Sequence, residues 1–88
     1  MITKQYTITS AQGLHARPAT TLIRLVKNFM SAISIQKGDK TTRLNSMINL
    51  LSMTIKGGET ITIIIEGEDE IDAAEALDIF FSKQLKDL

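Results

Sequence analysis

The segment SAISIQKGDKTTRL, Ser31 to Leu44, decides the fold of this 88-residue chain. Apolar and polar side chains alternate on both sides of the dipeptide Gly38-Asp39, which is the pattern of two half-buried strands joined by a tight turn. The segment therefore predicts a β-hairpin in the middle of the chain, although it leaves the type of turn open.

Two further strands are expected outside this hairpin. Near the N-terminus, Ile2, Tyr6 and Ile8 alternate with polar residues, and a period of two is typical of a strand with one buried face. The run TITIIIE at residues 60–66 is rich in β-branched side chains, which favour the extended backbone of a sheet. The chain thus supplies four strands.

The spacing of apolar residues predicts a helix from about Ala16 to Asn28 or Phe29. Pro18 suits its first turn, where the missing backbone N–H removes no hydrogen bond. The side chains expected at helical spacing on its apolar face are Ala19, Leu22, Ile23, Val26 and Met30.

A final helix is expected to follow Asp69, which is placed to cap it. Acidic residues in its first turn, and Lys83 and Lys86 in its last turn, match the direction of the helix dipole. Its buried stripe is expected to consist of Ile71, Ala74, Leu77, Phe81 and Leu85.

A short helix from Met47 to about Met53, capped by Asn45 or Ser46, completes the order β-α-β-β-α-β-α. Four strands and these helices can bury a common core only as two layers, with the helices on one face of the sheet. The hairpin and the single crossovers imply mainly antiparallel pairing. We therefore predict an α+β open-faced sandwich, formed by residues 1–88 as one domain because the chain is too short for two cores.

The composition excludes several classes of protein. With 43% hydrophobic and 23% charged residues, the chain is expected to fold as a soluble globule. It contains no cysteine, which excludes disulfides and thiol chemistry and fits a reducing cytoplasm. No apolar run is long enough for the core of a signal peptide or for a membrane span. A cytoplasmic protein with no membrane insertion is expected.

The net charge of zero argues against nucleic acid as the main partner. Charge is nevertheless uneven along the chain. Residues 1–44 carry seven basic side chains and one acid, a balance of +6, whereas residues 45–88 carry three basic and nine acidic side chains, a balance of −6. Folding either interleaves the two halves or leaves a basic surface that attracts acidic proteins and phosphate groups.

The stretch GLHARPAT, Gly13 to Thr20, holds the only histidine and the only proline of the chain. A single histidine can be an ordinary surface residue. A metal site is disfavoured because there is no second histidine and no cysteine. A Ser-His-Asp triad would lack its usual nucleophile elbow.

The position of His15 directly before the expected helix favours a different role. The first backbone N–H groups of a helix lack partners and carry partial positive charge, so the amides of Ala16 and Arg17 are expected to bind an anion such as phosphate. The same field favours a neutral, nucleophilic imidazole. The guanidinium of Arg17 adds a fork for a phosphoryl group, and Gly13 lets the backbone approach closely.

GLHARPAT resembles the active-site signature of the HPr family, the histidine-containing phosphocarriers of the bacterial phosphoenolpyruvate-dependent sugar phosphotransferase system. Chain length, order of elements and position of the histidine agree with that family. The resemblance implies that His15 is phosphorylated on Nδ1 by enzyme I and passes the group to the A domains of sugar permeases, with Arg17 steadying it. Such a protein is a covalent carrier without a cofactor, and its partners supply the catalysis.

The same resemblance implies a regulatory role for Ser46. In Gram-positive members, a serine at this position is phosphorylated by HPr kinase/phosphorylase, and the product serves as a corepressor with the catabolite control protein. A phosphate at the start of a helix is expected to leave the fold intact; the alternative is a plain helix cap. This chain departs from the family pattern nearby, with Asn45 for a basic residue, Asn49 for a small one and Thr54 where glycine is frequent.

A docking surface beside His15 is also implied. The short second helix cannot bury all of its apolar side chains, and we expect Leu50 and Met53 to face the core. The others form a patch that suits several partners, because methionine adapts its shape; they are Met47, Ile48 and Leu51.

Three other functions stay open on the sequence alone. A regulatory HPr paralogue acts through protein binding, although a known one has lost the histidine that this chain keeps. The nitrogen-related branch of the same system uses the histidine with different partners. A metabolite-binding module would need a defined pocket, whereas the glycine-containing stretch KGGE at residues 56–59 is typical of a tight turn.

Overall fold

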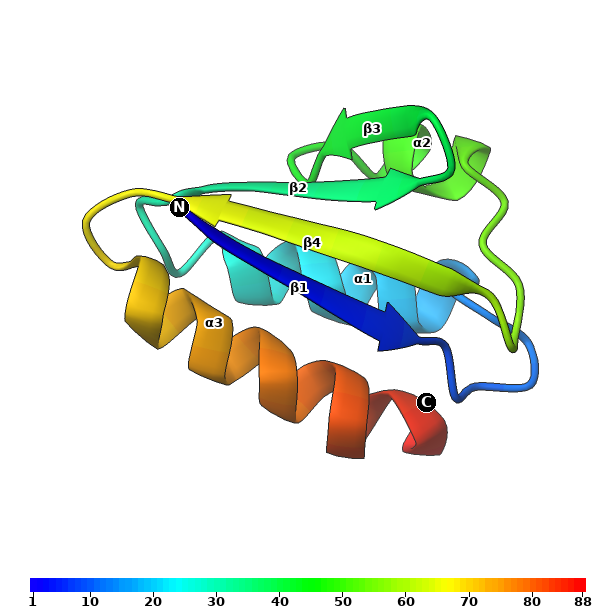
Figure 1. Ribbon diagram of the computed structural model, residues 1–88. Helices are drawn as coiled ribbons and strands as arrows, with labels where there is room; N and C mark the ends of the chain where they lie inside the picture. Colours follow the sequence, from blue (N-terminus) through cyan, green and yellow to red (C-terminus); the bar gives the residue numbers. More distant parts are fainter.

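The strand richest in β-branched residues, β4 (Thr60–Glu66), lies inside a four-stranded sheet in the computed structural model, which describes residues 1–88. It pairs with β1 (Ile2–Thr7) on one side and with β2 (Ala32–Lys37) on the other. β3 (Lys40–Arg43) pairs with β2 at the edge. The strand order is β1-β4-β2-β3 with every pairing antiparallel, and the predicted α+β fold is confirmed (Figure 1).

The hairpin between β2 and β3 closes through two residues, because Lys37 pairs directly with Lys40. Gly38 has a φ of +61°, whereas Asp39 has no positive φ. One glycine in the left-handed region at the first loop position is the geometry of a type II′ turn, which matches the twist of the flanking strands. Glycine is therefore needed at position 38.

The core lies between one face of the sheet and two helices, α1 (Ala16–Val26) and α3 (Glu70–Ile79), both of which contribute buried side chains to it (Figure 1). Alternation along β2 and β4 turns every second side chain toward the helices, and burial of each isoleucine at these positions stabilises the fold by about 1.5–3 kcal/mol. The fully covered residues of these two strands are Ile33, Ile35, Ile61, Ile63 and Ile65.

α1 ends at Val26, two or three residues earlier than the spacing of apolar residues indicates. The amides of Asn28 and Phe29 bond to carbonyls three residues before them, at 3.1 and 3.2 Å, which is the tightened geometry of a helix terminus. The prediction that Met30 shares the buried face of α1 is wrong, since its side chain is exposed. Its amide donates to the carboxylate of Asp69 at 2.8 Å, and the chain has already turned toward β2.

Asp69 occupies the N-cap of α3, but its side chain makes no capping bond, contrary to prediction. The carboxylate accepts hydrogen bonds from the amide of Met30, from the amide of Ser31 at 2.9 Å and from the Ser31 hydroxyl. These bonds, with that of the hydroxyl the largest, hold the pKa of Asp69 below its usual value. The side chain thus ties the turn before β2 to the turn before α3.

The buried stripe of the last helix is confirmed for four of its five predicted members, and Ile71 is the exception because it is 69% exposed. At that level of α3 the half-buried side chain is Glu70, whose carboxylate lies 2.9 Å from the N-terminal ammonium. Beyond Ile79 the helix widens into a π turn (Phe80–Gln84) and ends in a 3-10 turn (Leu85–Asp87). Lys83 and Lys86, which were predicted in the last turn of the helix, lie in these two turns and not in the α-helix.

α2 (Met47–Ser52) is a short helix that packs against α1 and near β3. Ser46 is its cap, because the Ser46 hydroxyl accepts a hydrogen bond from the amide of Asn49 at 3.3 Å. Leu50 and Met53 are buried, as predicted. None of the helices combines the length and the apolar character that crossing a membrane requires.

Candidate functional site

His15 is the N-cap residue of α1, and this helix begins at the end of the sheet where α2 also lies (Figure 1). Its backbone is extended and its side chain makes no capping bond, so the amides of Ala16 and Arg17 have no acceptor within the protein. The next residue, Pro18, has no N–H at all. The first turn therefore presents two free amides beside the imidazole, which is the arrangement that binds an anion.

The two ring nitrogens of His15 differ in their surroundings. The side chain as a whole is half-buried. Nε2 is buried without a hydrogen-bond partner, whereas Nδ1 is neither hydrogen-bonded nor among the buried unpaired atoms. A partner protein can therefore reach the ring through Nδ1. A neutral ring with its lone pair on Nδ1 carries its proton on Nε2.

The backbone before His15 packs directly on the segment that joins α2 to β4. Gly13 has a φ of +72°, and a Cβ there would stand 2.1 Å from the carbonyl oxygen of Ile55. The amide of Leu14 donates to that same carbonyl at 3.0 Å. A Cβ at Gly57 would likewise meet the carbonyl oxygen of Ser10 at 2.5 Å. The close approach predicted at Gly13 is present. The sequence did not predict that residues 55 and 56 are the backbone it approaches, although Gly57 in KGGE is a residue that permits such a contact.

A row of cations on the exposed side of α1, the basic row, has no carboxylate partner; it consists of Arg17, Arg24 and Lys27. The three ion pairs of the structure each join a positive group from residues 1–44 to an acid from residues 45–88, at 2.9, 3.8 and 3.1 Å. Folding therefore neutralises part of the charge asymmetry and leaves the basic row unpaired along α1, from Arg17 in the first turn to Lys27 at the C-cap.

The structure brings part of the predicted docking patch close to the first turn of α1. The hydroxyl of Thr20 lies 3.9 Å from the sulfur of Met47 and donates to the carbonyl of Ala16 at 2.8 Å. Met47 is half-buried, whereas Ile48 is 81% exposed and Leu51 is also open to solvent. Two apolar side chains of α2 therefore face solvent on the helix that adjoins the histidine site.

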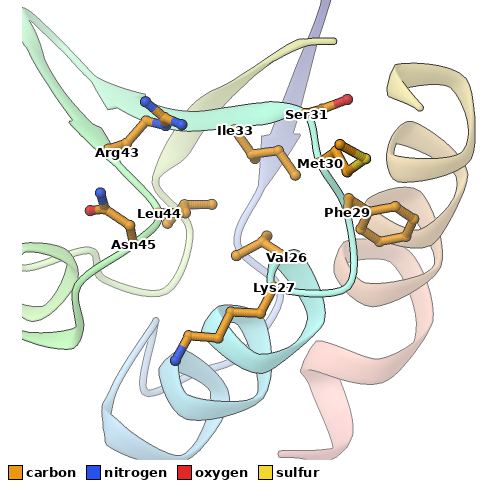
Figure 2. Close-up of a pocket in the computed structure, with 9 residues that line it drawn as sticks. All are labelled: Val26, Lys27, Phe29, Met30, Ser31, Ile33, Arg43, Leu44 and Asn45. Atoms are coloured by element: carbon orange, nitrogen blue, oxygen red, sulfur yellow. The ribbon is translucent and has the colours of Figure 1, made fainter. Parts of the chain in front are cut away.

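The cavities of the protein lie away from His15. One, of about 200 Å³, lies between the C-terminal end of α1 and the strands β2 and β3, with Val26, Ile33 and Leu44 among its apolar lining and Arg43 from β3 beside them (Figure 2). The other, of about 390 Å³, is lined by β3 and the turn before it and by α2 with its C-cap. Neither includes a residue of the His15 loop, so the histidine site is open surface. No three His, Asp or Glu side chains cluster as metal ligands would.

The chain is similar to known proteins over most of its length. The family described as "PTS HPr component phosphorylation site" matches residues 2–83. The chain is 39% identical to phosphocarrier protein HPr of Lysinibacillus sphaericus over 77 residues, 88% of each chain. It is 40% identical to HPr-like protein Crh of Halalkalibacterium halodurans over 84 residues, 96% of this chain and 100% of that one.

Solved structures show the same fold. The histidine-containing phosphocarrier protein of Mycoplasma superposes with a TM-score of 0.90 at 34% sequence identity, and the match covers 97% of each chain. The family match spans nearly the whole chain and includes the histidine motif GLHARPAT. The chain therefore belongs to the HPr family of phosphocarrier proteins of the phosphotransferase system.

Proposed function

We propose that this protein relays a phosphoryl group through Nδ1 of His15, from enzyme I charged by phosphoenolpyruvate to the A domains of sugar permeases. A member of the HPr family is a carrier and not itself a catalyst. Its structure must then supply a nucleophile and a place for the phosphoryl group. The proposal treats residues 1–88 as one phosphocarrier domain and needs no cofactor.

The observation that carries the proposal is the pair of free amides beside an accessible Nδ1. In the transfer step, the lone pair of Nδ1 attacks phosphorus in line; the N–P bond forms while the bond from phosphorus to the donor's leaving atom breaks. The phosphoryl dianion then lies next to the amides of Ala16 and Arg17, which donate to its oxygens. The Arg17 guanidinium adds charge-assisted hydrogen bonds. In the delivery step, an acceptor nucleophile attacks phosphorus; its new bond to phosphorus forms while the N–P bond breaks, and the electron pair returns to Nδ1 and restores the neutral ring.

The docking surface in this proposal is the exposed part of α2 together with the basic row. Met47, Ile48 and Leu51 supply apolar contact, while the cations of α1 attract an acidic partner surface. Enzyme I and the permease A domains would both use it, one after the other, because both must reach His15. An open site outside any cavity suits such an exchange of partners.

A second candidate function is regulation through protein binding alone, since the relatives include the HPr-like protein Crh at 40% identity. His15 favours the relay, because a binding protein has no need of a nucleophile beside free amides. A role in the nitrogen-related branch is distinguished from one in the sugar branch by the enzyme I that supplies the phosphoryl group. Labelling by the enzyme I of that branch, with none by the enzyme I of the sugar branch, would assign the protein there.

The relay is tested by mixing the protein with enzyme I and radiolabelled phosphoenolpyruvate. We expect one acid-labile phosphoryl group per chain, and none in His15→Ala. Circular dichroism of His15→Ala should match the unsubstituted protein, since the half-buried ring makes no hydrogen bond. Continued acid-labile labelling of His15→Ala would overturn the assignment.

We also propose that Ser46 is a regulatory phosphorylation site, with HPr kinase/phosphorylase and the catabolite control protein as partners. Ser46 is half-buried at the start of α2, and its hydroxyl accepts one backbone bond. Incubation with the kinase and ATP, followed by mapping of the phosphate by mass spectrometry, tests the site. Modification is expected at Ser46 and lost in Ser46→Ala; an unmodified Ser46 would refute it.

A further inference from the structure

Thr54 is the only residue other than glycine with a positive φ, at +52°. A β-branched side chain avoids this left-handed conformation, and such a conformation persists only where surrounding contacts hold it. Thr54 follows Met53, the C-cap of α2, and begins the connection to β4, which we call the 54–59 segment. Contacts with other parts of the fold therefore hold the 54–59 segment in place.

Two side chains hold the 54–59 segment at both ends. The ammonium of Lys37, on β2, donates to the carbonyl of Thr54 at 2.7 Å and lies 3.1 Å from the carboxylate of Glu59. The other oxygen of Glu59 accepts the amide of Lys56 at 2.6 Å. The pKa of Glu59 lies below its usual value, mainly because the Lys56 amide donates a hydrogen bond to the carboxylate and, to a smaller extent, because the Lys37 ammonium does. The carboxylate is therefore charged at neutral pH.

The same segment holds the loop that carries His15. The carbonyl of Ile55 accepts the Leu14 amide at 3.0 Å and stands against Gly13, where no Cβ would fit. At the other end, the amide of Gly58 donates to the carbonyl of Ile8 at 2.9 Å. Leu14 is the residue immediately before His15, so a shift of the 54–59 segment moves the backbone that positions the imidazole.

We propose that Lys37 and Glu59 are positioning residues for phosphoryl transfer at His15, acting through the 54–59 segment; the inference rests on the proposed relay function. Neither side chain reaches the imidazole. Their ion pair fixes the segment, the segment fixes Leu14, and Leu14 fixes the position of Nδ1 relative to the two free amides. In-line transfer depends steeply on such geometry. The side chains of Lys37 and Glu59 are 29% and 34% exposed, and a pair this exposed adds little to global stability.

The test compares Lys37→Met and Glu59→Gln with Lys4→Met. The control removes another lysine of an ion pair, Lys4 with Asp78 at 3.8 Å, between β1 and α3. Single-turnover transfer from phosphorylated enzyme I should slow by about threefold to tenfold in Lys37→Met and in Glu59→Gln. This effect is smaller than the roughly hundredfold loss that a 1 Å misplacement causes. The enzyme I concentration for half-maximal rate should stay unchanged, Lys37→Arg should restore the rate, and Lys4→Met should leave it unaltered.

Amide hydrogen exchange supplies the second readout. In Lys37→Met, the Leu14 amide should exchange several times faster, while the amide of Leu44, which donates to Ile33 at 2.9 Å, should be unaffected. Unchanged transfer rates, or equal loss of protection at both amides, would overturn the inference. If the unsubstituted protein accepts no phosphoryl group, the relay proposal fails, whereas the Leu14 comparison still shows whether the ion pair holds the loop.

Discussion

Gly13 lies so close to Ile55 that a Cβ at position 13 would stand 2.1 Å from the Ile55 carbonyl oxygen. That carbonyl also accepts the amide of Leu14, so the close approach and the hydrogen bond occur together just before His15. Glycine is required here for two reasons, the positive φ and the contact. The geometry of the histidine loop thus depends on a residue without a side chain.

Substitution of Gly13 separates these two reasons. Gly13→Ala should lower the free energy of unfolding by about 2–4 kcal/mol, because the methyl group forces two backbone segments apart. Gly38→Ala is the matched control: its φ is also positive, but nothing lies within 4 Å of the added carbon, so about 1–2 kcal/mol is expected. Urea unfolding followed by circular dichroism measures both. An equal loss in the two variants would contradict the role of the Ile55 contact.

Thr54 should gain from replacement by glycine. The left-handed conformation costs about 1–2 kcal/mol for a residue with a Cβ, and glycine removes this cost. Glycine also has more freedom in the unfolded chain, which reduces the gain in stability by about 0.5–1 kcal/mol. Thr54→Gly should therefore raise the free energy of unfolding by about 0.5–1 kcal/mol. The control is Thr42→Gly in β3, whose φ is not positive; it should destabilise the protein. A loss of stability in Thr54→Gly would contradict the strain at this position.

Asp69 should contribute to stability in a defined range of pH. Its pKa is lower in the folded protein than its ordinary value, mainly because the Ser31 hydroxyl and the Met30 amide donate to the carboxylate. The contribution is therefore complete above the unfolded pKa and is lost as the pH falls through the folded pKa. Asp69→Asn should be less stable than the unsubstituted protein near neutral pH, and the difference should shrink in acid.

The control for this prediction is Asp72→Asn. Asp72 lies exposed in the first turn of α3 and makes no hydrogen bond. Free energies of unfolding measured in urea at a series of pH values should show no comparable change for Asp72→Asn. A difference for Asp69→Asn that stayed constant down to strongly acidic pH would show that the carboxylate acts through its shape and not through its charge.

The strands and the core could be predicted because their information is local. The alternation of apolar and polar residues in 2–9, 31–44 and 60–66 indicates which side chains of each strand face the core. Four such strands can bury these side chains together with the helices only in a two-layer fold. Met30 and Ile71 were misplaced because helical spacing alone does not reveal where a helix ends or which way its first turn faces. Both outcomes depend on contacts between distant residues, those of Asp69 with Met30 and of Glu70 with the N-terminus.

The histidine site also has a part that could be predicted from the sequence and a part that could not. His15, Arg17 and the free amides lie within one motif, so their arrangement follows from the helix that begins there. The 54–59 segment joins them only after folding, because its contacts link Leu14 to Ile55 and Lys37 to Glu59. No spacing in the sequence reports these contacts, and only the glycines of KGGE hinted at a close approach.

Arg17 should matter for the rate of transfer more than for stability or docking. Its side chain is exposed and makes no ion pair, so Arg17→Ala should change the free energy of unfolding by less than about 0.5 kcal/mol. Loss of the guanidinium fork should slow transfer from phosphorylated enzyme I by about tenfold to a hundredfold. Arg24→Ala is the control: it removes another exposed charge of the docking surface but no group of the phosphoryl site, so it should weaken docking slightly and leave the transfer rate at saturating enzyme I unchanged. An unchanged rate in Arg17→Ala would count against its role.

Ile48 provides a test of the docking surface. It is 81% exposed on α2, and Ile71 is 69% exposed on α3, so serine at either position removes little buried area and stability should change by less than about 0.5 kcal/mol. A side chain at the centre of an interface contributes about 1–2 kcal/mol to binding, so Ile48→Ser should raise the dissociation constant for enzyme I by about fivefold to thirtyfold. Ile71→Ser should leave it unchanged. Titration calorimetry measures both, and equal affinities for the two variants would place the docking surface elsewhere.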